Sequence, residues 1–227
     1  NAKKYGIDPE KVMDFALIAI ILSVIGARAY YVIFHWESFA DNPISVFNLR
    51  TGGLAIYGGV IVAITSAIVF CRIKKINLGR FVDVCVPGLV IGQVIGRWAN
   101  FFNREAFGAE TDVFCRMGLT AADGTTIYVH PTFLYESLWN LIGLFILILF
   151  TRRGRRRYDG QCVLFYFFWY GLGRSWIEGL RTDSLYLGNT GIRVSQLLSL
   201  ILVLVSGTVL FLNRKRNKPD RQGGTHV

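Results

Sequence analysis

Charged residues are scarce in this sequence, and their scarcity decides the class of protein. Only 18% of the 227 residues are Asp, Glu, Lys or Arg, whereas 52% are hydrophobic and 14% are aromatic. A soluble domain carries more charge than this, and a disordered chain lacks so much aliphatic and aromatic side-chain area. The composition therefore excludes both classes and predicts a protein that crosses a membrane several times.

Cysteine and histidine are also few, which excludes several kinds of site. The four Cys and three His are scattered without a CxxC pair or a His/Cys cluster, so neither a disulfide framework nor a metal site is expected. The sequence has no HExxH, GxSxG or GxxxxGK(S/T) motif. We therefore expect no metal, no cofactor and no nucleophile supplied by this chain.

Six apolar stretches are each long enough for a transmembrane helix, which takes about 20 residues. They are residues 12–34, 53–71, 81–101, 132–150, 161–179 and 194–212. The loops between them are short except for a polar insert at residues 102–131. We expect an all-α polytopic membrane bundle, with residues 1–227 as a single transmembrane domain and residues 102–131 as a small extracytoplasmic insert.

The distribution of positive charge predicts the topology. The net charge is +10, and 17 of the 25 Lys and Arg residues fall in four segments at alternate ends of the spans. The positive-inside rule places these segments, and with them the C-terminus, in the cytoplasm. Because the positive charge is explained by topology, it does not indicate a nucleic-acid partner. The segments are Lys3, Lys4 and Lys11; Arg72, Lys74, Lys75 and Arg80; Arg152, Arg153, Arg155, Arg156 and Arg157; and Arg214, Lys215, Arg216, Lys218 and Arg221.

The remaining eight cations are all arginines, although topology alone would not require that. A guanidinium is a planar fork that binds phosphate or carboxylate through two parallel hydrogen bonds. An outward half that carries only arginine therefore predicts an anion-binding site, with snorkelling to the interface as the less favoured alternative for any single residue. These residues are Arg28, Arg50, Arg97, Arg104, Arg116, Arg174, Arg181 and Arg193.

Two stretches gather polar side chains at the outer ends of spans. In the fifth span, Tyr170, Arg174, Glu178 and Arg181 share one helix face, either as a functional site or as an internal brace. In the third span, glycines at positions 88, 92 and 96 predict close approach of a neighbouring backbone. The polar groups that follow must be paired or must bind a ligand. They are Arg97, Asn100, Asn103 and Glu105.

Two shorter stretches add candidates. Residues 52–59 place Gly pairs on both sides of Tyr57, which indicates either a crowded backbone with the phenol pointing into it or an interfacial tyrosine. Glu136 lies inside the expected membrane boundary, so it is a candidate partner for one of the arginines. His130 is interpreted as an interfacial residue, with a role as a base as the alternative.

Residues 96–108, which read Gly-Arg-Trp-Ala-Asn-Phe-Phe-Asn-Arg-Glu-Ala-Phe-Gly, resemble the signature of the prolipoprotein diacylglyceryl transferase family. Residues 27–31, 52–59, 130–136 and 170–181 resemble further blocks of that family in the same order, so the resemblance covers nearly the whole chain. It implies a seven-helix protein of the bacterial inner membrane. Six spans that start inside would fit if the first helix, which carries a further active-site Tyr in relatives, is absent from this chain.

The resemblance also implies a reaction. The diacylglyceryl group of phosphatidylglycerol would move to the lipobox cysteine thiol of a preprolipoprotein, and glycerol phosphate would be released without a cofactor. An anion or lipid-headgroup transporter that uses the same arginines is the alternative, and a noncatalytic lipid-binding scaffold is a second.

The family's functional positions are transferred where this chain matches them. Arg97 and Arg174 would bind the headgroup phosphate as catalytic residues, and Glu105 would orient the glycerol hydroxyls or Arg97. Tyr57 stands where many relatives have His, and a phenol with a pKa near 10 is a poor base. The acceptor of the thiol proton therefore stays open among Tyr57, Tyr170 and Glu178. The expected substrate-binding residues are Asn100, Asn103, Gly108, Tyr170, Glu178 and Arg181.

Overall fold

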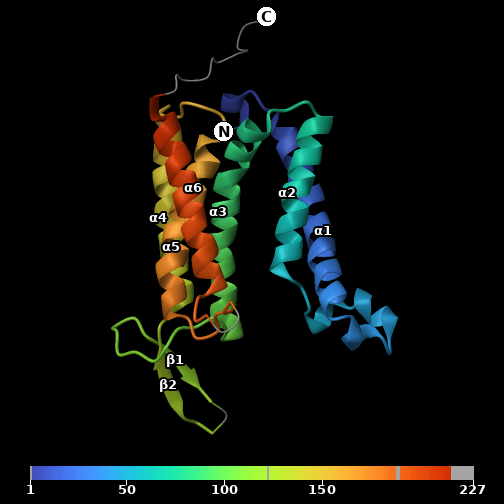
Figure 1. Cartoon of the computed structure of the whole chain (residues 1–227), viewed down its shortest axis with the longest axis vertical. Coiled ribbons are helices and arrows are strands. Elements are labelled where there is room, and N and C mark those ends of the chain that lie inside the picture. The colour runs from blue at the N-terminus through green and yellow to red at the C-terminus, as the bar shows by residue number, and fades with distance from the viewer. Residues whose placement is uncertain (1, 122, 188–189, 216–227) are drawn as a thin grey trace, which may run out of the picture. The chain divides into compact units, whose positions relative to one another are not determined.

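The computed structural model describes residues 2–121, 123–187 and 190–215. Arg216, Lys218 and Arg221 of the last basic segment lie outside the described residues. The long helices are α1 (Pro9–Phe34), α2 (Ile56–Ile73), α3 (Leu78–Asn103), α4 (Thr132–Arg152), α5 (Gln161–Ile177) and α6 (Val194–Leu212) (Figure 1).

The expected helical membrane architecture is confirmed. Among the described helices, five are long and apolar enough to cross a membrane. The exception is α5, which has 17 residues, carries Arg174 in its last turn, and continues as the 3₁₀ turn Glu178–Leu180. The number six is therefore approximate, because α5 is the shortest of the six long helices.

The contacts divide the chain within α3, after Val84, into two compact units. In the N-terminal unit, α1 packs against α2 where two glycines face each other. A Cβ added at Gly58 would lie 2.4 Å from the carbonyl oxygen of Gly26, so the backbones touch there. The crowding expected around residues 52–59 is therefore present, and the neighbour is α1.

Arg28 organises the segment that joins α1 to α2. This segment consists of the 3₁₀ helices Trp36–Phe39, Pro43–Phe47 and Leu49–Thr51. The buried Arg28 guanidinium donates five hydrogen bonds of 2.7–3.0 Å to backbone carbonyls of this segment and of the two glycines that follow it. Every N–H of the fork is used, so Arg28 stabilises the chain and has no donor left for an anion. The carbonyls belong to Ser45, Val46, Asn48, Gly52 and Gly53.

In the C-terminal unit, α5 packs against both α4 and α6. Two tryptophans fix the α4–α5 contact reciprocally. The indole N–H of Trp139 donates to the carbonyl of Trp169, and that of Trp169 donates to the carbonyl of Trp139, both at 2.8 Å. Each ring also fills the space over a glycine of the other helix, Gly173 or Gly143.

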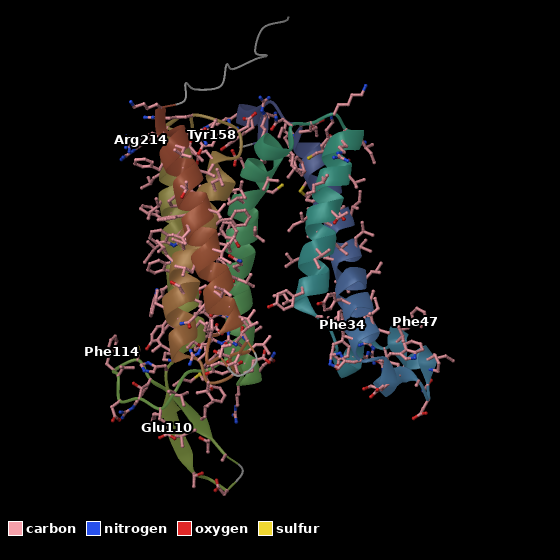
Figure 2. The ribbon with its side chains drawn as sticks, viewed as in Figure 1. Phe34, Phe47, Glu110, Phe114, Tyr158 and Arg214 are labelled. Atoms are coloured by element: carbon pink, nitrogen blue, oxygen red, sulfur yellow. The ribbon has the colours of Figure 1, made fainter. Side chains whose placement is uncertain are left out.

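The insert contains an antiparallel hairpin that the sequence analysis does not predict. Strands β1 (Met117–Thr120) and β2 (Thr126–Val129) pair with Met117 opposite Val129, and these two residues pack on Phe133 of α4. We call this end of the C-terminal unit the hairpin end. Figure 2 shows Phe114 at the hairpin end, and Tyr158 and Arg214 at the opposite end.

Candidate active site

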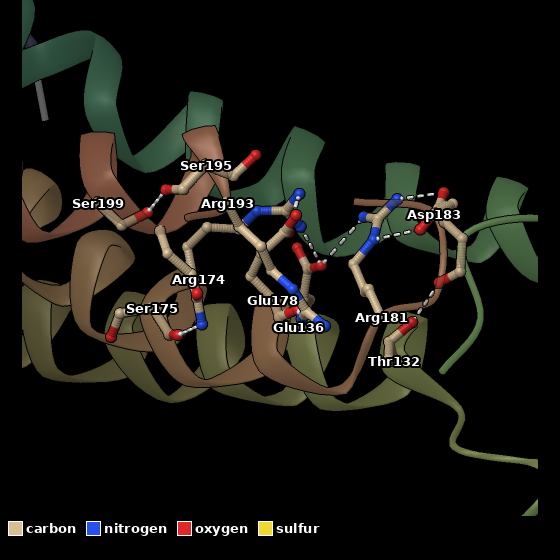
Figure 3. Close-up of polar contacts among 12 residues, drawn as sticks. Thr132, Glu136, Arg174, Ser175, Glu178, Arg181, Asp183, Arg193, Ser195 and Ser199 are labelled. Atoms are coloured by element: carbon tan, nitrogen blue, oxygen red, sulfur yellow. Dashed lines mark hydrogen bonds and ion pairs between the residues drawn. The ribbon is translucent and has the colours of Figure 1, made fainter. Parts of the chain in front are cut away.

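Glu136 begins the second turn of α4 and holds arginines from two neighbouring elements. Its Oε2 lies 2.5 Å from Nη2 of Arg97 on α3, and its Oε1 accepts a hydrogen bond of 2.6 Å from Nη1 of Arg174 on α5. Nη1 of Arg181 lies 3.8 Å from the same Oε1. The carboxylate is buried, so it needs such partners. The expectation that Glu136 pairs with an arginine is confirmed (Figure 3).

Glu178 supplies the second buried carboxylate of the cluster. It follows Arg174 by one turn, and its Oε2 lies 2.6 Å from Nη2 of Arg174. Its backbone carbonyl accepts a hydrogen bond from the guanidinium of Arg193, the residue directly before α6. Arg174 is therefore held from both sides, by Glu136 and by Glu178.

Arg181 lies just after the 3₁₀ turn and binds Asp183 with both prongs of its fork. Nε donates to Oδ1 at 2.9 Å, and Nη2 donates to Oδ2 at 2.7 Å. The hydrogen bond from Arg181 holds the pKa of Asp183 below its usual value, although partial burial opposes this. Burial alone would lower the pKa of Arg181, but the bond and charge of Asp183, together with the two glutamates, raise it.

The cluster carries a small positive excess. Three arginines surround two buried carboxylates, which leaves one net positive charge. If Arg193 and Asp183 are included, four cations face three anions and the excess is again one. A site with this balance can take up one further negative charge.

Gly108 joins the insert to the loop after α5. Its N–H donates to the carbonyl of His130 at 2.9 Å, and the next N–H, that of Ala109, donates to the carbonyl of Leu180 at 2.9 Å. A Cβ at Gly108 would lie 2.6 Å from the Cβ of His130, so only glycine fits. Gly108 thereby places Arg181 close to the start of α4.

Asn100, Asn103 and Glu105 form a separate polar group at the end of α3. The carbonyl of Asn100 accepts from the Glu105 N–H at 3.0 Å, and the Asn103 side chain donates to Oε1 of Glu105 at 3.0 Å. The side chains of Asn103 and Glu105 are exposed. The Glu105 carboxylate thus accepts from Asn103 at the end of α3. The acidic partner of Arg97 is Glu136.

The two tyrosines among the candidates lie in different units. Tyr170 lies one turn before Arg174 in α5, and its ring stacks on that of Tyr166 with centroids 5.7 Å apart. Tyr57 lies in the first turn of α2 in the N-terminal unit, directly before Gly58. Apart from Tyr57, the candidate residues, Tyr170 included, number nine and belong to the C-terminal unit.

The sequence assigned roles to Arg97, Arg174 and Arg181 and left the other outward arginines without individual roles, which the structure now provides. Arg116 binds the exposed Asp112 at 2.9 Å and covers the ring of Tyr128, and Arg104 reaches a carbonyl of β1. Arg193 and Asp183 join the cluster without having been assigned a role. Nothing in the sequence of the turn Glu178–Leu180 indicates that the carbonyl of Glu178 accepts a hydrogen bond from Arg193.

The family model and the curated relatives that match this chain carry the same family name. A family model described as prolipoprotein diacylglyceryl transferase matches residues 1–212. Relatives named phosphatidylglycerol–prolipoprotein diacylglyceryl transferase include those of Chloroflexus aggregans, 43% identical over 93% of this chain and 77% of the relative, and Listeria welshimeri, 46% identical over 96% and 80%. The relative from Shouchella clausii is 44% identical over 96% of this chain and 80% of its own length.

Proposed function

The chain belongs to the prolipoprotein diacylglyceryl transferase family, and on that premise we propose that Arg97, Arg174 and Arg181 hold the phosphate of its lipid substrate. The protein is a multi-pass membrane transferase that acts on phosphatidylglycerol and prolipoproteins, as its relatives are named. Their shared name favours this function over an anion transporter.

One observation carries the assignment of the site. Guanidinium groups from α3, from α5 and from the loop after it converge on the single carboxylate of Glu136. The cluster has one net positive charge, and the phosphodiester of phosphatidylglycerol has one negative charge. Arginine forks that are already fixed by carboxylates need no reorganisation when the anion arrives.

The proposed chemistry is displacement at a glycerol carbon. The sulfur of the lipobox cysteine forms a bond to the terminal carbon of the diacylglyceryl group, while the bond from that carbon to the phosphate oxygen breaks. Negative charge develops on the departing phosphate, which leaves as glycerol phosphate and which the arginines stabilise. The thiol proton passes to a base at the site.

The acceptor of the thiol proton stays open among Tyr57, Tyr170 and Glu178. Glu178 is ion-paired with Arg174, and Tyr57 belongs to the N-terminal unit. We propose that Glu178 fixes Arg174, that Gly108 holds the insert in place, and that Asn100, Asn103 and Glu105 shape the entrance beside Arg97.

We further propose that the site opens toward the outside of the bacterial inner membrane, with the C-terminus in the cytoplasm. In the C-terminal unit, the basic segment at 152–157 and Arg214 lie at the end opposite the hairpin. The positive-inside rule assigns that end to the cytoplasm.

The test uses purified protein with phosphatidylglycerol and a lipobox peptide, and mass spectrometry to detect the diacylglyceryl adduct. Arg97→Lys and Arg174→Lys keep the charge but remove the fork, so we expect a loss of about 100-fold or more in turnover. Arg116→Lys, at an exposed ion pair, should keep nearly full turnover. Near-normal transfer by both lysine variants would contradict the assigned role.

A further inference from the structure

A ladder of polar side chains continues from the arginine cluster into the membrane-spanning parts of α3 and α5. Gln93 lies four residues before Arg97, and Tyr170 and Tyr166 lie four and eight residues before Arg174. Four residues of helix rise about 6 Å. Both helices run toward the hairpin end, so these side chains lie one to two turns deeper than the cluster.

A direct hydrogen bond links the two sides of this ladder. The amide Nε2 of Gln93 donates to the hydroxyl of Tyr166 at 2.7 Å, and the Tyr166 ring stacks on Tyr170. Tyr166 accepts this bond and therefore still has its own proton to donate. The amide oxygen of Gln93 is buried and has no hydrogen-bond partner among the described residues.

Packing of α3 against α5 does not account for this arrangement. A hydrogen bond between membrane helices stabilises their packing only weakly. A buried polar group that stays unpaired costs more free energy than such a bond contributes. Polar residues at this depth are expected to serve a ligand or a pathway. The unused donor and acceptor capacity of Gln93 and Tyr166 points to a polar ligand group at this level.

The glycines of α3 leave room beside the ladder. Within the C-terminal unit, a Cβ added at Gly88, Gly92 or Gly96 would meet nothing within 4 Å. The close backbone approach expected from their spacing is therefore not made within this unit. The glycine strip precedes Gln93 and Arg97 by one residue each, so it lies about 100° around the helix from them. A flexible hydrocarbon chain can lie along such a smooth face.

From this ladder we infer a subsite on Gln93 and Tyr166 for the ester carbonyls of the diacylglyceryl group. Ester carbonyls only accept hydrogen bonds, so they need donors. With the amide oriented as observed, the Tyr166 hydroxyl and the second N–H of the Gln93 amide are free to donate to the lipid. With the amide rotated by 180°, its oxygen accepts from Tyr166 and both amide hydrogens are free instead. Only glycerol carbons separate the phosphate from the esters, a spacing comparable to one helical turn. This inference rests on the proposed function.

The test compares two phosphatidylglycerols with the same chains, one linked by esters and one by ethers, which lack the carbonyls. The readout is kcat/KM for transfer to the lipobox peptide. We expect the wild-type protein to prefer the diester by about tenfold. Gln93→Leu should bring the diester down to the level of the diether, so that the ratio falls to about one. Tyr166→Phe, which removes only a hydroxyl group, should also reduce the ratio and serves if Gln93→Leu does not fold.

Gln196→Leu is the matched control. Its amide bonds the carbonyl of Ser175 at 3.0 Å between α6 and α5, away from the ladder, so the variant should keep the tenfold ratio at any level of activity. A ratio of one in the wild type, or an unchanged ratio in both ladder variants, would overturn the subsite. Arg97→Lys should reduce kcat/KM by the same factor for both lipids. Normal activity of the arginine variants would count against the headgroup site and leave the ester ratio as a separate result.

Discussion

At the scale of single residues, Glu136 determines where two arginines point. Its two oxygens take one guanidinium each from α3 and α5, and it is buried. A buried ion pair contributes little net stability, but removing one partner costs about 3–5 kcal/mol because the other charge stays behind. Glu136 is therefore best understood as a residue that positions the arginines.

Glu136→Gln should disable the site without removing any arginine. An amide has one acceptor oxygen and no charge, so the three guanidiniums would repel each other and lose their alignment. We expect kcat/KM to fall about 100-fold and the thermal midpoint to drop, measured by peptide transfer and by thermal unfolding in detergent. The matched control is Asp112→Asn, which removes a fully exposed carboxylate from Arg116 and should change neither quantity appreciably. Activity near that of the wild type would show that the arginines are aligned by something else.

The sequence predicted the chemistry of the arginines better than their individual roles. It indicated that Glu136 is a candidate partner for one of the arginines, because charges at the end of an apolar span need partners. The family resemblance added Arg97 and Arg174 as the headgroup ligands. It did not separate them from Arg28, whose fork binds five backbone carbonyls. Both uses require a planar fork with many donors, so residue type alone does not distinguish an anion site from a backbone brace.

At the scale of elements, the reciprocal tryptophan contact sets the spacing of the two helices that carry Glu136 and Arg174. Trp139 lies over Gly173 of α5, and Trp169 lies over Gly143 of α4. Gly173 directly precedes Arg174, and a Cβ added there would come within 2.3 Å of the Trp139 ring. The close approach of α4 and α5 thus depends on glycine at these positions.

Gly173→Ala should therefore push α4 and α5 apart and lower both stability and activity. Overpacking of this kind typically costs about 1–3 kcal/mol, which is visible as a lower thermal midpoint. Gly59→Ala is the control, because its added Cβ would have its nearest neighbour at 3.4 Å and alanine favours a helix. If Gly173→Ala were as stable as Gly59→Ala, the tryptophan contact would not be setting the spacing.

The loop after α5 is held partly by Arg181 and Asp183, and this predicts a dependence on pH. The folded protein lowers the pKa of Asp183 below the usual value of about 3.9. Its contribution is then complete above about pH 4 and is lost as the pH falls through the lower folded value. The carboxylate is about half exposed, so the effect is small.

This dependence is measurable by comparing the wild type with Asp183→Asn. We expect the wild type to have the higher thermal midpoint between pH 5 and 7, and the difference to shrink below about pH 4. A difference that stayed constant down to pH 3 would assign it to packing of the side chain and not to its charge.

The elements themselves were predicted unevenly. Six spans follow from long apolar runs, and their bounds lie within a few residues of the helices. The hairpin in the insert was missed because its strands have four residues each and are fixed by Met117 and Val129 packing on Phe133, a contact between segments. The short α5 shows the reverse case, since its apolar run predicts a span to residue 179, whereas the α-helix ends at Ile177 and continues as a 3₁₀ turn.

At the scale of the whole molecule, the basic segments and the candidate active site lie at opposite ends of the C-terminal unit. The carboxylate–arginine cluster and the hairpin are at one end, and the basic residues at positions 152–157 and Arg214 are at the other. Lys and Arg on the cytoplasmic side fix the orientation during insertion, while the arginines of the site must be paired to remain buried. This division allows a chain with net charge +10 to keep only about one uncompensated charge at its site.

The proposed orientation is testable with single cysteines placed at the two ends. In a variant without native cysteines, Phe114→Cys introduces a thiol at a fully exposed position at the hairpin end, and Arg214→Cys introduces one at the opposite end. A maleimide that does not cross membranes should label Phe114→Cys in intact spheroplasts and should label Arg214→Cys only after permeabilisation. Of the native cysteines, Cys71 and Cys162 are buried, and Cys85 and Cys115 are partly buried, so a fully exposed position is the better probe. Labelling of Arg214→Cys in intact cells would reverse the topology and place the arginine cluster on the cytoplasmic side, where a secreted prolipoprotein's lipobox would not reach it.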